Sequence, residues 1–434
     1  MKPNIVMILV DDLGYGDISC FGGPQTRTPH IDSIAEQGLK MTQFYANSTV
    51  CSPSRAALLT GRYPDMVGVP GVIRQQPENS WGYFDPSAVT LPDMLRRGGY
   101  DTVHVGKWHL GLEPENHPCN RGFDLFRGFI DDMMDDYWTH RRFGRNGMMR
   151  NTETIDPQGH ATDLFTQWAV EEITQRAAGD RPFFLYLAYN APHTPIQPPD
   201  DWVERVKARK PELDDKRARY IALVEHLDHG IGQVLEAVAA SGSESDTLVV
   251  FTSDNGGWLP AGAYNGPLRG GKIDMYEGGI RVPLCARWPS RIAAGTETDQ
   301  MAILMDLFPT FCELAGVPVE HEIEGRSILP LLGGAEVDFA DRWYYWVRRE
   351  GGAQSASGVR NVYLGNDYHA VRRGDRKLLH NTPFAPLELF DLADDPAEHR
   401  PMEVDTANDE ETSRLARYMQ EQVRAAGAVP WRKG

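Results

Sequence analysis

Polar side chains that could do chemistry follow four apolar, strand-like segments of the chain. These side chains are Asp11, Asp12, Lys107, His109, His193, Asp254 and Asn255. A single aspartate after a strand most often caps a turn or a helix. Four strands that all end in this way favour a shared site instead, because ligands bind beyond the carboxyl ends of the strands in an open parallel α/β sheet. We therefore expect these side chains to converge.

The acidic members of this set point to a metal ion. The candidate ligands are Asp11, Asp12, Asp254 and Asn255. They offer only oxygen atoms, and hard oxygen donors favour Ca²⁺ or Mg²⁺ over zinc or copper. We expect Ca²⁺, because a large and flexible cation tolerates several carboxylates, with Mg²⁺ as the alternative. Helix capping is the competing interpretation, but it does not explain why separate strand ends would bring carboxylates together without a cation.

Cys51 and Arg55 form a second candidate cluster. Pro53 suits the first turn of a helix, so Cys51 is expected at a helix entrance, where backbone N–H groups favour an anion. Arg55 follows one turn later on the same face. A thiol, a positive helix end and a guanidinium together predict an oxyanion site. A buried cysteine at a helix start is the structural alternative.

The elements that must position these residues alternate between strands and helices. Buried strands are predicted at 4–10, 102–105, 183–188 and 247–252, and amphipathic helices at 161–173 and 220–238. Near-continuous apolar strands that alternate with helices indicate a sheet covered on both faces. The predicted fold is α/β, with a large, mostly parallel sheet flanked by helices on both faces.

The pattern changes near Gly333-Gly334. Short strands are predicted at 343–347, 361–364, 368–372 and 377–379, and an amphipathic helix at 411–423. We interpret 1–333 as a catalytic domain. Residues 334–434 are expected to form a smaller α+β subdomain with an antiparallel sheet, which completes the substrate pocket.

Composition excludes several functional classes. The chain has 434 residues, of which 41% are hydrophobic and 24% charged, and its net charge is −17. This balance excludes a disordered or collagen-like chain and opposes binding to nucleic acid. No apolar run reaches the roughly 18 residues of a membrane span, so no membrane partner is expected. The apolar N-terminus is predicted to be a strand rather than a signal peptide. The protein would be periplasmic or secreted if a signal was removed, and otherwise cytoplasmic.

The residues around Cys51 carry a family resemblance. Cys51-Ser-Pro-Ser-Arg55 and the following Ala-Ala-Leu-Leu-Thr-Gly-Arg resemble the Cys-x-Pro-x-Arg signature of the type I sulfatases, in the alkaline phosphatase superfamily. Further blocks resemble that family in the same order along the chain, at 3–17, 106–111, 191–195, 252–256, 268–283 and 388–392. The resemblance therefore covers nearly the whole chain.

The resemblance implies a modified nucleophile and a bound metal. In the family, the signature cysteine is oxidised to formylglycine, so formylglycine-generating machinery is an expected partner. The metal would be held by the four oxygen ligands named above, and the modified side chain at position 51 would be a further ligand. Arg55 would orient the hydrated formylglycine, while Lys107 and Lys272 would contact the sulfate oxygens.

The resemblance also assigns the proton transfers. Asp254 would help to deprotonate one hydroxyl of the hydrate, which attacks sulfur. His193 would donate a proton to the departing alcohol, and His109 would accept the proton of the second hydroxyl as sulfate leaves. A serine or an unmodified cysteine lacks that second hydroxyl, which is the chemical reason for the modification.

Substrate choice depends on aromatic and arginine side chains outside these motifs. The candidates are Tyr137, Trp138, Arg141, Arg142, Arg348 and Arg349. Such clusters suit stacking on a sugar ring and pairing with a second anionic group, although a solvated basic loop would look the same. We expect an exo-acting carbohydrate sulfatase that acts on a small or terminal sulfated saccharide. The oligomeric state is left open.

Three alternatives compete with this function. A phosphate or phosphonate ester hydrolase of the same superfamily would share the metal site. Asn255 weighs against it, since phosphonate-cleaving relatives tend to carry histidine at the matching position. An inactive sulfosugar-binding homologue would not need the intact set of Cys51, Arg55, Asp254 and the two histidines. A thiol hydrolase that uses Cys51 directly would have no need of the metal carboxylates.

Overall fold

The computed structural model describes residues 2–339, 341–351, 365–381, 385–427 and 429. Its centre is an eleven-stranded sheet. Five neighbouring strands run parallel, in the order β10 (Thr247–Ser253), β1 (Asn4–Val10), β9 (Phe183–Ala188), β3 (Asp101–Lys107) and β4 (Leu125–Phe129). The four predicted strands are all among them, and the prediction of a large, mostly parallel sheet is confirmed.

Strands of mixed orientation extend both edges of this parallel core. On one side β11 (Arg281–Arg287) pairs antiparallel with β10 and with β2 (Leu39–Tyr45). The short strands β12 (Thr296–Thr298) and β13 (Ala302–Ile303) pair parallel with β2. On the other side β7 (Met148–Arg150) and β8 (Glu153–Thr154) follow β4. The sheet is therefore mixed at its edges and parallel where the candidate site residues emerge.

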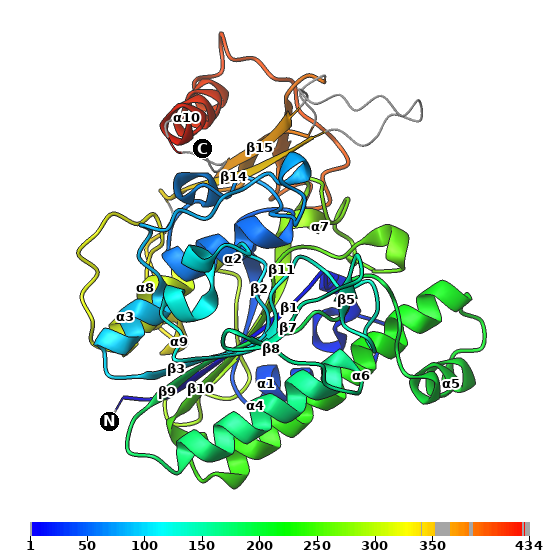
Figure 1. Cartoon of the computed structure of the whole chain (residues 1–434). Helices are drawn as coiled ribbons and strands as arrows, with labels where there is room; N and C mark the ends of the chain where they lie inside the picture. The colour runs from blue at the N-terminus through cyan, green and yellow to red at the C-terminus, as the bar shows by residue number, and fades with distance from the viewer. Residues whose placement is uncertain (1, 340, 352–364, 382–384, 428, 430–434) are drawn as a thin grey trace.

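Helices cover both faces of the sheet because successive residues of each central strand point to opposite sides. In β1, Ile5, Met7 and Leu9 join one apolar core, whereas Val6, Ile8 and Val10 join the other. The first core contains α2 (Cys51–Thr60), α3 (Leu91–Arg97), α8 (Leu307–Leu314) and α9 (Leu329–Leu332). The second contains α1 (Pro29–Glu36), α4 (Ala161–Ala177) and α6 (Asp215–Ala240) (Figure 1).

A smaller antiparallel sheet lies at the C-terminal end, as predicted. Its four strands are β14 (Trp343–Gly351), β15 (Gly365–Arg373), β16 (Arg376–His380) and β17 (Glu388–Asp391), and α10 (Glu410–Ala426) packs on it (Figure 1). The strand predicted at 361–364 lies outside the described residues. Tyr45 and Ala57 of the larger unit share an apolar cluster with this sheet. The boundary at 333/334 stays a prediction.

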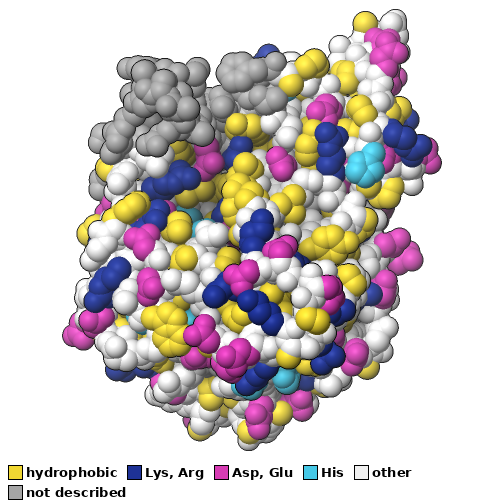
Figure 2. Space-filling view, turned by 90° about the vertical axis from the view of Figure 1, so that its right-hand side faces the viewer, with side chains coloured by type: hydrophobic (Ala, Val, Ile, Leu, Met, Phe, Trp, Pro, Cys, Tyr) yellow, Lys and Arg dark blue, Asp and Glu magenta, His cyan; other side chains and the backbone are white. Residues whose placement is uncertain are grey.

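Two further α-helices and a two-stranded hairpin belong to the described part of the chain. These are α5 (Asp200–Arg209), α7 (Glu277–Ile280) and a hairpin of β5 (Arg141–Arg142) with β6 (Arg145–Asn146). None of the helices in the described part of the chain has the length and apolar character that crossing a bilayer requires. On the face shown in Figure 2, the described acidic and basic side chains are interspersed rather than gathered by sign.

Candidate active site

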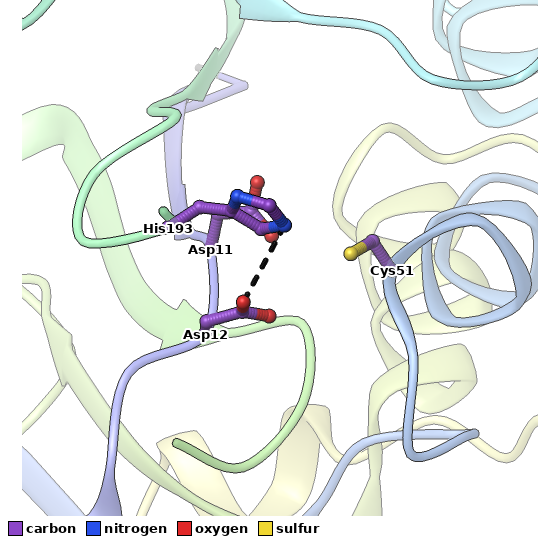
Figure 3. Close-up of side chains that lie close together, drawn as sticks. All are labelled: Asp11, Asp12, Cys51 and His193. Carbon is purple, nitrogen blue, oxygen red and sulfur yellow. Dashed lines mark ion pairs between the residues drawn. The ribbon is translucent and has the colours of Figure 1, made fainter. Parts of the chain in front are cut away.

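The register of β1 against β10 brings the two acidic strand ends together. Val10 pairs with Ser253, and the backbone N–H of Asp254 donates to the carbonyl of Val10 at 3.1 Å. Asp11 and Asp12 therefore lie beside Asp254 and Asn255. Figure 3 shows the Cys51 sulfur directed from the start of α2 towards Asp11, Asp12 and His193. One ligand atom from each of these four residues lies within 4.8 Å of the others.

Three buried carboxylates meet three cationic side chains at this edge. Lys107 Nζ lies 2.5 Å from Asp11 Oδ2, and Lys272 Nζ lies 2.7 Å from Asp12 Oδ2. Arg55 donates to Asp254 Oδ2 from Nη2 at 2.7 Å and from Nε at 3.0 Å. Asp11 and Asp254 are fully buried and Asp12 is 2% exposed. Such burial is sustainable only because each carboxylate has a close cation.

The carboxylates differ in their pKa values. Burial raises the pKa of Asp11, but the opposing charges of Lys107, His193 and Arg55 outweigh it and hold the pKa well below its usual value. Burial, followed by repulsion from Asp11, raises the pKa of Asp254 to about 7. Close like charges drive their pKa values apart in this way. The crowding of negative charge indicates a site that suits a further cation.

The donor set fits a hard metal ion. Asp11 Oδ1 and Asn255 Oδ1 are buried and have no hydrogen-bond partner. Asn255 directs its Nδ2 donor to Asp12 Oδ1 at 2.8 Å, which leaves its own oxygen available. Buried oxygens without partners are costly unless something binds them, and oxygen donors suit Ca²⁺ or Mg²⁺.

Cys51 lies at the first position of α2 and is 2% exposed, with Lys272 Nζ 3.8 Å from its sulfur. Burial, and after it the Asp11 carboxylate, raises the pKa of the Cys51 thiol well above its usual value. A cysteine that attacks directly needs the opposite shift, because the thiolate is the nucleophile. The unmodified side chain is therefore poorly suited to act as a thiol hydrolase.

The two site histidines have assignable tautomers. His109 Nε2 lies 3.0 Å from the carbonyl of Ile73, which can only accept, so Nε2 carries the hydrogen. His109 Nδ1 is then a buried lone pair without a partner. His193 Nδ1 donates to the carbonyl of Thr194 at 2.7 Å, and its Nε2 lies 3.5 Å from Asp12 Oδ2. Burial is the main cause that lowers the pKa of both rings. The second cause is the positive charge of a lysine, Lys107 for His109 and Lys272 for His193.

Of the seven described non-glycine residues with positive φ angles, three lie at the site. Asp12, His109 and Ile273 have positive φ angles of 66°, 63° and 79°. Such angles cost free energy for residues other than glycine and gather at functional sites. Ile273 donates its backbone N–H to the carbonyl of Thr49 at 3.0 Å, which anchors the Lys272 loop beside Cys51. This support from Thr49 has no signal in the sequence.

The geometry agrees with comparisons to known proteins. A family model described as Sulfatase matches residues 3–317. The chain belongs to the sulfatase family. A second model, N-sulphoglucosamine sulphohydrolase, C-terminal, matches residues 271–426 of this sulfatase. Sulfatases generally use a formylglycine and a divalent metal, and the group of possible metal ligands includes Cys51.

Named relatives support the sulfatase activity. The N-acetylgalactosamine-6-sulfatase of Canis lupus familiaris is 35% identical over 367 residues, which cover 79% of this chain and 68% of that enzyme. Human arylsulfatase A is 33% identical over 442 residues, which cover 92% of this chain and 82% of that enzyme. A solved structure of Ps i-CgsB in complex with k-i-k-neocarrahexaose is 31% identical in sequence and superposes with a TM-score of 0.88. The match covers 100% of this chain and 95% of the Ps i-CgsB chain. This protein is a sulfuric ester hydrolase.

A cavity of about 240 Å³ opens at the site of this sulfatase. Its lining includes Asp12, Cys51, His109, His193 and Lys272. Arg55, Lys107, Asp11 and Asp254 lie buried behind these residues. The residues predicted from strand ends and from the cysteine motif are thus brought together around one cavity.

Most of the residues predicted to bind the sugar lie elsewhere, and only Arg142 of the six lines this cavity. Tyr137 is a core residue that is 1% exposed, and its hydroxyl donates to the carbonyl of His193 at 2.9 Å. It therefore supports a site residue from behind. Trp138 is 46% exposed and packs edge-on against His160, away from the cavity.

The predicted arginines outside the cavity have structural partners. Arg141 forms a bidentate pair with Asp156 at 3.0 Å. Arg348 stacks on Tyr368 at 3.9 Å, and Arg349 pairs with Asp367. These three arginines are not among the residues that line the cavity, and their contact with the sugar stays a prediction. Sequence reasoning also missed Arg74, Asp132, Trp258 and Glu350, which do line the cavity.

Proposed function

We propose that this sulfatase removes sulfate from a sulfated carbohydrate, using a formylglycine formed from Cys51 and a divalent cation. The single observation that carries the proposal is the convergence on Cys51. Its sulfur lies at the start of α2, 3.8 Å from Lys272 Nζ and in the same cluster as Asp11, Asp12 and His193. The carbohydrate class is supported by what the relatives act on or bind, according to their names.

Two groups would complete this site. A formylglycine supplies, as its hydrate, one hydroxyl to attack sulfur and a second whose deprotonation releases sulfate. A divalent cation supplies charge stabilisation, and Asp11, Asp12, Asp254 and Asn255 would hold it. We favour Ca²⁺, because three carboxylates suit a large ion.

The cationic side chains bind and orient the sulfate. Lys272 reaches the cavity beside position 51, and Lys107 and Arg55 lie behind it. Arg55 Nη1 also donates to the carbonyl of Lys107 at 3.1 Å, which fixes the two cations relative to one another. Preorganised charges of this kind stabilise negative charge as it develops, without reorganising during the reaction.

The histidine tautomers fit two different proton transfers. The lone pair on His109 Nδ1 is ready to accept a proton from the group at position 51. His193 presents Nε2 to the cavity and keeps its Nδ1 hydrogen bonded to Thr194. Once protonated beside the Asp12 carboxylate, His193 Nε2 can donate to the departing alcohol.

The size of the cavity favours action on a terminal residue. Its volume of about 240 Å³ is below the roughly 300–1,000 Å³ typical of drug-sized ligands. One sulfated ring suits this space better than several. We therefore propose exo action, which activity on polymer interiors without activity on oligosaccharide ends would refute.

Peptide mass spectrometry across position 51 tests the nucleophile. Loss of sulfur and two hydrogens with gain of one oxygen is expected for the aldehyde. Cys51→Ala should abolish sulfate release, whereas Cys312→Ala, at a buried cysteine in α8, serves as the matched control. Retained turnover in Cys51→Ala would contradict the covalent route.

Paired substrates test the reaction class. Sulfate release from sulfated mono- and oligosaccharides is expected to exceed phosphate release from the matching phosphate esters by orders of magnitude. Faster phosphate or phosphonate release would favour the alternative hydrolase. Binding of sulfated sugar without turnover, in a protein carrying the aldehyde, would favour a binding protein.

A further inference from the structure

Of the described residues, two arginines line the cavity, and both are paired with carboxylates. Arg74 donates from Nη2 to Glu350 Oε1 at 3.1 Å and from Nη1 to the carbonyl of Asn79 at 3.1 Å. The Arg74 and Glu350 side chains are 25% and 15% exposed. Arg74 is therefore fixed in place. Glu350 also lies 3.5 Å from Arg348 Nη1, so this carboxylate offsets the charge of two guanidiniums at the cavity wall.

Arg142 is held more tightly. Its Nε donates to Asp132 Oδ1 at 2.8 Å and its Nη2 to Asp132 Oδ2 at 3.0 Å, and Nη1 donates to Asp135 Oδ1 at 2.8 Å. The ring of Phe143 lies 4.0 Å from the guanidinium carbon. All three guanidinium nitrogens thus face carboxylates, so Arg142 has little charge to offer an incoming anion.

These four residues, Arg74, Glu350, Arg142 and Asp132, form what we call the outer wall of the cavity. The cations around Cys51 are paired as well, Arg55 with Asp254, Lys107 with Asp11 and Lys272 with Asp12. The surroundings of Cys51 differ from the outer wall in the buried oxygens of Asp11 and Asn255 that have no hydrogen-bond partner, which a divalent cation would use. Among the described residues that line the cavity, Lys272 is the one remaining cation, and it lies beside position 51. Lys272 is itself paired with Asp12, which also lines the cavity. A bound divalent cation would give the end at position 51 an excess of positive charge for one anion, whereas the outer wall would stay balanced.

We propose that the outer wall selects a sugar ring that carries a single anionic group, with Asp132 and Glu350 as the specificity-determining residues. This inference rests on the proposed function. Sugar hydroxyls both donate and accept, so carboxylate oxygens and guanidinium N–H groups in alternation can bind them. The substrate class is a monosulfated ring whose other substituents are uncharged.

A second sulfate or a carboxylate on the same ring would gain little from the outer wall. Each guanidinium that attracts it has a carboxylate within about 3 Å that repels it. The second anion would also lose hydration on entering a cavity of about 240 Å³. Carboxylates that reject a competing ligand are a common source of specificity.

The test compares kcat/KM for two series of sugars. The first series contains galactose, N-acetylgalactosamine and N-acetylglucosamine with one sulfate at each available hydroxyl. The second contains their disulfated counterparts. For the wild-type protein, we expect the best monosulfated sugar to exceed its disulfated counterparts by at least about tenfold.

Two variants assign the preference to the outer wall. Glu350→Gln and Asp132→Asn keep the shape and remove the charge, and each should reduce the ratio of monosulfated to disulfated kcat/KM by about tenfold. Glu322→Gln is the matched control, because Glu322 pairs with Arg62 on the surface with its side chain 82% exposed. The control should leave the ratio unchanged. Thermal melting checks that each variant is folded, and Glu350→Gln alone suffices if Asp132→Asn does not fold.

The outcomes separate the two claims. Equal or better turnover of disulfated sugars by the wild-type protein, or an unchanged ratio in folded Glu350→Gln, would overturn the inference and leave the proposed function standing. Hydrolysis of aryl sulfates without release from any sulfated sugar would refute the proposed carbohydrate function, and the inference with it.

Discussion

Removing the charge of Lys272 tests the electrostatic reasoning most directly. Its Nζ lies 3.8 Å from the sulfur of Cys51 and 2.7 Å from Asp12 Oδ2, and its side chain is 15% exposed. Lys272→Met keeps most of the length and apolar contact of the side chain. What it removes is one positive charge next to the reacting centre.

The size of the effect follows from this distance. Two unit charges about 4 Å apart interact by about 4 kcal/mol at an effective dielectric constant of about 20. That corresponds to about a thousandfold change in rate, at 1.36 kcal/mol for each factor of ten. Loss of one preorganised donor to a developing oxyanion costs about 10²–10³ in other enzymes. We expect Lys272→Met to lower kcat/KM for sulfate esters by about 10²–10³.

The assay measures release of 4-nitrophenol from 4-nitrophenyl sulfate. Lys272→Arg should retain more activity than Lys272→Met, and Lys216→Met, at an exposed lysine near the start of α6, should match the wild-type protein. Metal content and melting temperature separate lost charge from lost metal or lost fold. A decrease below tenfold in a folded, metal-loaded Lys272→Met would refute the reasoning.

Three further perturbations test the site and its support. Burial raises the pKa of Asp65 to about 7, so the folded state holds a proton that the unfolded state releases, and stability falls as pH rises from about 4 to 7. Asp65→Asn should therefore raise the free energy of unfolding by up to about 4 kcal/mol at pH 8 and much less at pH 4, as urea melts at both pH values would show. Chelation of the metal should abolish activity and lower the melting temperature, because the three carboxylates would lose their cation. Comparing the activity that added Ca²⁺ restores with the activity that added Mg²⁺ restores identifies the ion. Gly256→Ala should cost about 1–3 kcal/mol or more, because its Cβ would lie 1.8 Å from the carbonyl of Gly278, whereas Gly179→Ala, with its nearest atom at 3.3 Å, should melt normally.

Sequence reasoning was most successful where a local rule fixes the outcome. The strand ends at Asp11 and Asp254 could be placed together because parallel strands deliver their carboxyl ends to one edge. Pro53 located the start of α2, and hence Cys51, because proline suits a first helical turn. Both inferences need only backbone geometry, which short stretches of sequence encode.

It was least successful for side chains whose partners are distant in the sequence. Arg74 meets Glu350 across 276 positions, and neither residue belongs to a recognisable motif. Tyr137 has an aromatic ring of the kind that stacks on sugars, yet it is buried behind His193. Aromatic and arginine residues serve cores, surface pairs and binding sites alike, so their type alone does not locate a pocket.

A count of charges connects the metal to the reaction. Above about pH 7, where Asp254 is ionised, Asp11, Asp12 and Asp254 cancel the charges of Arg55, Lys107 and Lys272. Both histidines have lowered pKa values and add no charge there. In a protein of net charge −17, such a balanced site offers little attraction to an anion. A divalent cation would change the balance to +2, and a sulfate ester with one negative charge would leave one positive charge in excess. That excess would stabilise the negative charge that develops as the S–O bond breaks. We infer that the cation is what converts a neutral buried cluster into a sulfate-binding site, so its removal should weaken substrate binding as well as turnover.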